Sequence, residues 1–312
     1  MKIAVIVPTI RPESWERFYD QWRPLFRKHD VDLFKVDDSG SSPVCFREII
    51  LAESGRILFA ECGQLAPDFE RQPSKEWLFN KTDGCRNLGF YWAEQLTKPD
   101  VFITLDDDVY PIGDPIQDHI DALSMSVSPN WMSTAQDWRV RGIPVFGEKW
   151  PVMLSHGVWA GVPDFDAPTQ LLHPNVQDVA FNKTNVPHGV LFPLCIMNCA
   201  FRRELLPWMY QAPMSKRLAE YNVSVGDRFG DIWSGVVAKL ACDLNQWGVV
   251  TGYSTIYHSR ASNVFANLRK ESVFLEQNET FVQDWQDQET TNEYVLLYRR
   301  MLNAWQKDLA NE

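Results

Sequence analysis

Short apolar runs alternate with helical patterns through the first third of the chain. The runs Ile3–Val7, Val31–Val36 and Val101–Leu105 have the length and β-branched content of buried strands, and a further strand is expected at 56–60. Between the first runs, large aromatic residues recur at helical spacing, and an apolar helical pattern covers residues 85–96. Strands that alternate with helices predict an α/β protein with a mostly parallel central sheet flanked by helices.

The chain beyond residue 130 follows a different pattern. Residues 130–200 are rich in Pro, Gly and Trp and lack clean periodicity, which favours a substrate-shaping region with a few strands. A helical pattern covers 226–244, and apolar residues recur at helical spacing from Tyr294 to Leu309. We expect one main domain, residues 1–265, and a C-terminal helical extension, residues 266–312, that packs on it.

Polar residues follow three of the predicted strands. Thr9 and Arg11 come after the first strand, Asp37 and Asp38 after the second, and Asp106–Asp108 after the strand at 101–105. In open α/β sheets, ligands bind beyond the carboxyl ends of the strands. We therefore expect these side chains to line one crevice.

The aspartate triplet is the strongest chemical signal. Three consecutive carboxylates after a buried strand repel one another unless a cation or hydrogen-bond donors offset their charge. Mn²⁺ or Mg²⁺ prefers oxygen ligands and takes one or two protein carboxylates together with phosphate oxygens. Asp106 and Asp108 are the predicted metal ligands, and Asp106 and Asp107 are also expected to contact ribose and sugar. A solvated acidic turn is the alternative.

Two further segments are candidates for nucleotide binding. Asp37 or Asp38 can accept hydrogen bonds from a base or ribose, and an ordinary capped turn is the alternative. Lys81 and Arg86 flank the start of a predicted helix, where amides and a guanidinium can bind phosphate. A simple capping role for Asp83 is the alternative at that helix.

Two single residues are candidates for the edge of the crevice. Asp231 stands beside Trp233 in a predicted helix, and a surface carboxylate is its alternative interpretation. His258 follows an apolar strand-like run and is a candidate contact for a metal or phosphate, with a structural role as its alternative.

Charge and composition argue against several classes of partner. The net charge of −11 argues against nucleic acid or an anionic membrane, because both need a basic surface. No apolar stretch reaches the roughly 18 residues of a membrane span. The six cysteines form no CxxC motif, which favours free thiols in a reducing compartment, so we expect a cytoplasmic protein.

Several segments together resemble one known family. In the same order along the chain, VPTIRPESW, LDDDVYP, VRGIP, GVPDFDAPTQ, FPLCIMNCAFRREL and DIWSGVVAKL resemble the reversibly glycosylated polypeptides, the UDP-arabinopyranose mutases of plants. This family is grouped with the GT-A type glycosyltransferases. The most specific part is DFDAPTQ at 164–170 with FPLCIMNCAFRREL at 192–205.

The resemblance implies a fold, a reaction and site residues. It implies a GT-A, Rossmann-like fold and an enzyme that interconverts UDP-arabinopyranose and UDP-arabinofuranose with Mn²⁺ or Mg²⁺. It also implies reversible glycosylation on an arginine, whose counterpart in the VRGIP segment is Arg141. The triplet matches Asp106–Asp108, and Asp231 matches the family's acidic residue beside Trp. Self-association into a homo-oligomer is expected, because family members assemble with themselves.

A mechanism and two rivals follow from this resemblance. Arg141, Asp231 and Asp107 are the expected catalytic residues, with Asp231 as the base because a guanidinium is a poor nucleophile at its usual pKa. One rival is a glycosyltransferase that passes the sugar to a separate acceptor, with Asp231 as general base. The other is a non-catalytic subunit of a complex with an active relative.

Overall fold

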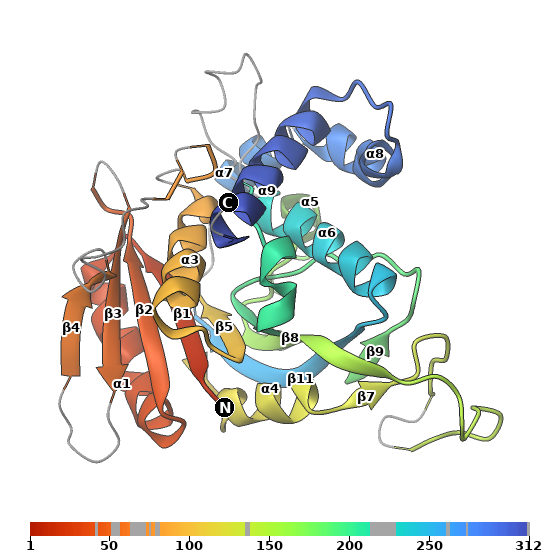
Figure 1. Cartoon of the computed structure of the whole chain (residues 1–312), viewed down its shortest axis with the longest axis horizontal. Coiled ribbons are helices and arrows are strands. Elements are labelled where there is room, and N and C mark those ends of the chain that lie inside the picture. Colours follow the sequence, from red (N-terminus) through yellow and green to blue (C-terminus); the bar gives the residue numbers. More distant parts are fainter. Residues whose placement is uncertain are drawn as a thin grey trace.

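A computed structural model describes residues 1–40, 43–50, 57–62, 73–74, 76–78, 82–134, 138–212, 229–259, 263–272 and 274–310. Within these residues, one central sheet has helices packed against it (Figure 1). The strands, in chain order, are β1 (Ile3–Thr9), β2 (Val31–Asp37), β3 (Val44–Ile50), β4 (Ile57–Glu61), β5 (Val101–Leu105), β6 (Val109–Pro111), β7 (Ser126–Val127), β8 (Trp150–Gly161), β9 (Thr184–Val186), β10 (Asn198–Arg202) and β11 (Gly248–His258).

The helices cover both faces of this sheet, and each face has its own apolar core. The α-helices, in chain order, are α1 (Pro12–Lys28), α3 (Arg86–Thr97), α4 (Pro115–Leu123), α5 (Ala167–Leu172), α6 (Gly230–Leu244), α7 (Val264–Glu271), α8 (Leu275–Gln286) and α9 (Glu293–Ala310). Two 3₁₀ turns, η1 (Asp83–Cys85) and η2 (Arg203–Trp208), complete the described helical segments. None of the described helices is long and apolar enough to cross a bilayer.

The α/β class is confirmed, but the sheet is mixed rather than mostly parallel. The strand order is β4-β3-β2-β1-β5-β10-β8-β11-β6, with β7 on β8 and β9 on β11. Parallel pairing is limited to β2–β1, β1–β5 and β8–β11, and the other pairs are antiparallel. The difference arises because β3 and β4 return directly beside β2, and β10 inserts antiparallel between β5 and β8. An antiparallel neighbour needs no crossover helix, so the alternation of strands and helices does not predict it.

Local sequence explains the elements that hold the site. Pro12 opens α1, where its missing N–H costs nothing, and the helix buries Phe18, Trp22 and Phe26 at helical spacing. Trp22 Nε1 donates a hydrogen bond to the carbonyl of Val109, just beyond the aspartate triplet, at 2.9 Å. Helix α1 therefore packs against the start of β6, directly after the triplet.

The C-terminal helix α9 buries its predicted apolar stripe in the core. Trp305 meets Trp77 edge to face, with ring centroids 4.8 Å apart. Trp77 Nε1 donates to Asp308 Oδ2 at 2.7 Å, and Tyr298 Oη donates to the carbonyl of Tyr210 at 2.9 Å. These contacts join α9 to segments far away in the sequence. The division into domains at residue 265 stays a prediction.

Candidate functional site

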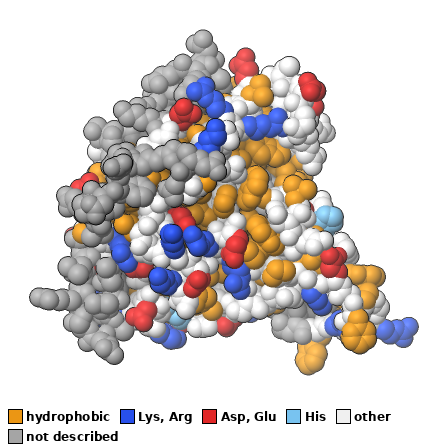
Figure 2. All heavy atoms as spheres, in the orientation of Figure 1, with side chains coloured by type: hydrophobic (Ala, Val, Ile, Leu, Met, Phe, Trp, Pro, Cys, Tyr) orange, Lys and Arg blue, Asp and Glu red, His pale blue; other side chains and the backbone are white. Residues whose placement is uncertain are grey.

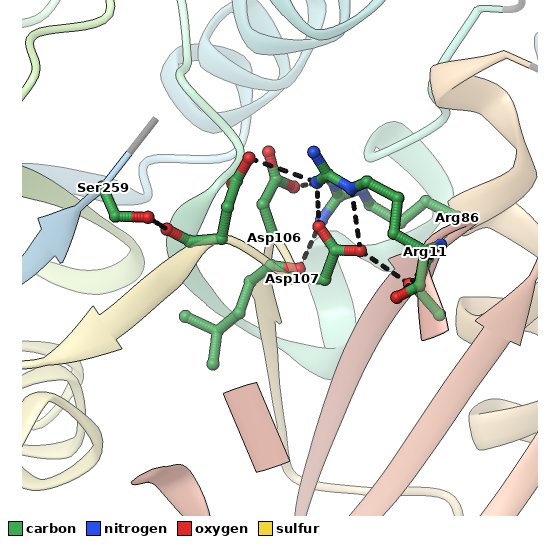
Figure 3. A network of polar contacts seen from close by, with 8 residues as sticks. Arg11, Arg86, Asp106, Asp107 and Ser259 are labelled. Atoms are coloured by element: carbon green, nitrogen blue, oxygen red, sulfur yellow. Dashed lines mark hydrogen bonds and ion pairs between the residues drawn. The ribbon is translucent and has the colours of Figure 1, made fainter. Parts of the chain in front are cut away.

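The aspartate triplet lies where two parts of the sheet meet. Asp106–Asp108 connects β5 to β6, and β6 pairs with the end of β11, so that Val109 lies opposite His258. The backbone N–H and the hydroxyl of Ser259 both donate to the carbonyl of Asp108, at 3.3 and 3.1 Å. Figure 3 shows Ser259 approaching from one side of the triplet, and Arg11 and Arg86 from the other.

Asp107 is the buried member of the triplet. Asp107 is only 2% exposed. Thr9 Oγ1 donates to Asp107 Oδ2 at 2.6 Å, and the Arg11 guanidinium contacts both carboxylate oxygens. Arg11 also reaches Asp108 Oδ2 at 3.1 Å. The contacts of Asp107 therefore hold Arg11 in place, and the contact of Asp107 with ribose or sugar stays a prediction.

Asp106 is the more open member. Its side chain is 34% exposed and pairs with Arg86, whose own side chain is 4% exposed. Arg86 also donates to Thr104 Oγ1 and to the carbonyl of Leu105. A buried guanidinium with partners on β5 thus fixes the Asp106 carboxylate from behind, while part of Asp106 remains accessible.

Asp108 experiences the repulsion that the sequence predicts. Burial raises the pKa of Asp108, and the charge of Asp106 raises it further, against the lowering effects of His258 and Arg11. Burial is the main cause of this raised pKa, and the charge of Asp106 adds to it in spite of the ion pair with Arg11. A divalent cation would offset the charge of these two carboxylates.

His258 adds a third donor suited to a metal. Its Nδ1 lies 2.8 Å from the carbonyl oxygen of Val162. Because a carbonyl only accepts, Nδ1 donates to it, and in the neutral form of the ring the Nε2 lone pair could bind a metal. Within the described ranges, no group of three or more His, Cys, Asp or Glu side chains is already arranged to hold a metal. Asp106, Asp108 and His258 therefore do not form a three-ligand site by themselves, and a cation here would take one or two of them together with substrate phosphates.

The end of β8 is pressed against the end of β11. Val162 N donates to the carbonyl of His258 at 3.1 Å. Gly161 has φ +80°, and a Cβ atom there would lie 2.6 Å from the His258 oxygen. Only glycine combines that backbone conformation with such a close approach. This glycine brings the segment after β8 to the edge of the crevice.

Asp164 and Asp231 lie on that edge together. Asp164 Oδ2 accepts a hydrogen bond from Cys195 Sγ at 3.0 Å. Burial raises the pKa of the Cys195 thiol, and the charges of Asp164 and then Asp231 raise it further. Asp231 itself lies in the first turn of α6 and accepts from the N–H of Ile232. Asp164 was not among the predicted site residues, although it opens DFDAPTQ, one of the two segments that make up the most specific part of the resemblance.

The remaining nucleotide candidates lie beside β1 or outside the described residues. The N–H of Asp38 donates to the carbonyl of Thr9 at 3.1 Å, which brings the end of β2 next to Thr9. Asp37 Oδ1 accepts from the N–H and hydroxyl of Ser39. Burial alone would raise the pKa of Asp37, but these hydrogen bonds lower it, as in the capped turn considered above. Lys81 falls outside the described residues.

Arg141 lies far from the triplet. It is exposed in the segment that joins β7 to β8, where Ile143 N donates to the carbonyl of Val140. That segment projects from the molecule at the lower right of Figure 1. Strand β8 runs for 12 residues from Trp150, next to this segment, to Gly161, next to the crevice. At about 3.3 Å per residue, its two ends are roughly 36 Å apart.

The sequence comparisons with known proteins agree on one family. The family model described as reversibly glycosylated polypeptide matches residues 1–297. UDP-arabinopyranose mutase 3 of Arabidopsis thaliana is 32% identical over 292 residues, which cover 86% of this chain and 74% of that protein. UDP-arabinopyranose mutase 1 of Oryza sativa subsp. japonica is 31% identical, with 86% and 73% covered. A solved structure of glucosyl-3-phosphoglycerate synthase from Mycobacterium tuberculosis with Mn²⁺, UDP and phosphoglyceric acid aligns at a TM-score of 0.45 and 16% identity, covering 90% of this chain and 78% of that one.

Proposed function

Because the chain belongs to the reversibly glycosylated polypeptide family, we propose that it interconverts the pyranose and furanose forms of a UDP-sugar, with UDP-arabinose as the substrate. The observation that carries this proposal is the cluster of polar side chains where β5 ends and β6 pairs with the end of β11. There, the partly exposed Asp106 pairs with Arg86, Asp108 pairs with Arg11, and His258 lies near enough to Asp108 to lower its pKa.

The carboxylate end of the crevice is assigned to the diphosphate. Asp106 and Asp108 would hold a divalent cation, Mn²⁺ or Mg²⁺, with His258 as a further candidate ligand, and the cation would neutralise charge on the diphosphate. Arg11, held by Asp107, contributes a second positive charge beside Asp108. Asp107 is then a positioning residue for Arg11.

The opposite edge of the crevice is assigned to the sugar. Asp164 accepts a hydrogen bond from the Cys195 thiol, and the charge of Asp231 also raises the pKa of that thiol, so we assign both carboxylates to one ligand. Carboxylates accept hydrogen bonds from sugar hydroxyls, and Asp231 can accept the proton of the hydroxyl that forms the new ring. Holding UDP and the sugar side by side favours recapture over hydrolysis.

The test is product analysis without an acceptor. The purified protein is incubated with UDP-arabinopyranose and Mn²⁺, and the nucleotide sugars are separated by chromatography. A new UDP-arabinofuranose peak is expected. Release of UDP only after addition of an acceptor would replace the mutase with a glycosyltransferase. No change across several UDP-sugars would favour the non-catalytic subunit.

A further inference from the structure

The segment between β7 and β8, here called the arginine loop (described residues 128–134 and 138–149), exposes large apolar side chains. Phe146 is 99% exposed and Trp138 is 79% exposed. Three more apolar residues of the loop are also exposed: Trp131, Met132 and Val145. In Figure 2, apolar and basic side chains gather at the lower right, where this loop projects. Exposed aromatic groups together with arginine are typical of protein–protein contacts.

The loop also differs in charge from the rest of the molecule. Arg139 and Arg141 are exposed on it, whereas the whole chain carries a net charge of −11. In the site itself, the five carboxylates of Asp106–Asp108, Asp164 and Asp231 outnumber the two guanidinium groups of Arg11 and Arg86. A second copy of the chain therefore presents a surface that complements the loop in charge.

The base of the loop is fastened at its own end of the sheet. Val127 pairs with Trp150 across β7 and β8. Lys149 Nζ donates to Ser128 Oγ at 2.6 Å, and the N–H of His188 donates to the carbonyl of Pro129 at 2.8 Å. Both ends of the loop are thus held where β8 begins.

This anchoring separates Arg141 from the crevice of its own chain. Arg141 lies nine residues before Trp150. Even a fully extended chain of that length spans only about 32 Å, and the crevice lies roughly 36 Å away along β8. Arg141 could approach its own crevice only if the turns of the arginine loop unfolded and the loop extended along β8.

We propose that Arg141 acts in the crevice of a second copy of this chain. The arginine loop of one copy docks beside β5 and β11 of the other, burying Trp138 and Phe146 and bringing the Arg141 guanidinium to the carboxylates. The same contact repeated in the opposite direction closes a two-fold dimer in which each copy gives and receives one loop. The proposal rests on the proposed function, because Arg141 is needed only if the chain is a mutase of the family whose arginine it matches. The docking itself follows from exposure, charge and anchoring.

The decisive experiment combines two inactive variants. Asp108→Asn removes a carboxylate from the crevice, and Arg141→Ala removes the guanidinium from the loop. Each homomer is therefore expected to lose conversion of UDP-arabinopyranose. The two variants are then co-expressed with different affinity tags and purified as the heteromer. That heteromer contains one intact crevice facing one intact loop, and about half of the wild-type turnover is expected for a dimer.

An inactive heteromer, or an Arg141→Ala homomer that retains activity, would overturn the inference while leaving the mutase function standing. If the wild-type protein itself converts no UDP-sugar, the proposed function fails instead, and the contact is judged by assembly. Sedimentation is expected to show a dimer for the wild type and at least a tenfold weaker one for Phe146→Ser. The control Leu244→Ser removes an equally apolar side chain, 85% exposed on α6, and should leave the dimer unchanged. A monomeric wild type, or equal assembly of the two variants, counts against the docking.

Discussion

At the scale of single residues, a buried polar network lies beneath the crevice. Asn198 donates to the carbonyls of Val158 and Ser254, and its Oδ1 lies 2.9 Å from His119 Nε2. His156 Nε2 accepts from the N–H of Cys195, at 3.3 Å, and so fixes the residue that faces Asp164 and Asp231. Uncharged histidines satisfy these contacts, and burial makes their protonated forms costly.

The titration of the two histidines predicts a loss of stability in mild acid. Burial lowers the pKa of His119 to about 4 and that of His156 to about 3. In the unfolded chain, both titrate near 6.5. Below that value the unfolded state binds more protons, so stability falls as the pH drops from 6.5 towards the folded pKa values. Each histidine contributes about 1.4 kcal/mol per pH unit.

This prediction is measured by urea unfolding at several values between pH 7 and pH 5. The variant His119→Gln keeps a side chain able to donate and accept but does not titrate. Its free energy of unfolding should fall with pH about half as steeply as that of the wild type. Equal slopes in the two proteins would show that His119 is protonated in the folded state.

At the scale of elements, the hairpin of β3 and β4 carries a pair of thiols. Cys45 lies in β3 opposite Val36, and Cys62 directly follows β4. Their Sγ atoms are 3.2 Å apart, and both residues are buried. A disulfide needs an S–S distance of about 2.05 Å, so a small movement suffices to join the two strands.

Oxidation is therefore expected to link Cys45 to Cys62. With oxidised glutathione as the oxidant, Cys45 and Cys62 form a disulfide bond. Their two hydrogens leave on two molecules of reduced glutathione. The reaction should be slow and should speed up as the pH rises, because burial raises the pKa of Cys45. Closing the intervening loop should raise the free energy of unfolding by about 3 kcal/mol.

Mass spectrometry of tryptic peptides detects this link directly. A peptide pair joined through Cys45 and Cys62 should appear after oxidation and vanish on reduction. The Cys62→Ser variant is the control and should show neither the link nor the added stability. The prediction fails if the wild type stays fully reduced, or if the variant gains the same stability.

At the scale of the whole molecule, the crevice joins two halves of the sheet. One half, β2-β1-β5, supplies Thr9, Arg11 and the triplet. The other, β10-β8-β11-β6, supplies His258 and, at the end of β8, Asp164. A ligand that contacts both halves must carry one group that binds to each half. A diphosphate joined to a sugar has two such groups.

The two-part crevice predicts metal-dependent binding of UDP. In calorimetric titrations, UDP should bind at least tenfold more tightly with Mn²⁺ than without it. Asp108→Asn should remove this gain because it removes a charged metal ligand, while weak binding without Mn²⁺ should persist. Asp20→Asn, an exposed position on α1, is the matched control and should behave as the wild type. A full Mn²⁺ effect in Asp108→Asn would exclude Asp108 as a ligand.

Local pattern was enough for much of the fold and part of the site. The apolar runs predicted β1, β2 and β5 within a few residues, because a buried strand needs a continuous apolar segment. The rule that ligands bind at strand ends also predicted that Thr9, Arg11 and the triplet lie together, which their hydrogen bonds confirm. What it did not predict is which partner each group takes. The pairing of Arg11 with Asp107 and the meeting of Asp164 with Cys195 join residues far apart in the chain.

The sequence by itself determined the α/β class, the carboxylates at a strand end and the resemblance to one family, because all three are local features of residue type and spacing. Only the tertiary structure decided the mixed sheet, the buried role of Asp107 and the position of Arg141. The last of these has a simple physical reason. A motif indicates what a residue can do, but the length and direction of β8 decide where it stands, and they place Arg141 at the end of the strand opposite to the crevice.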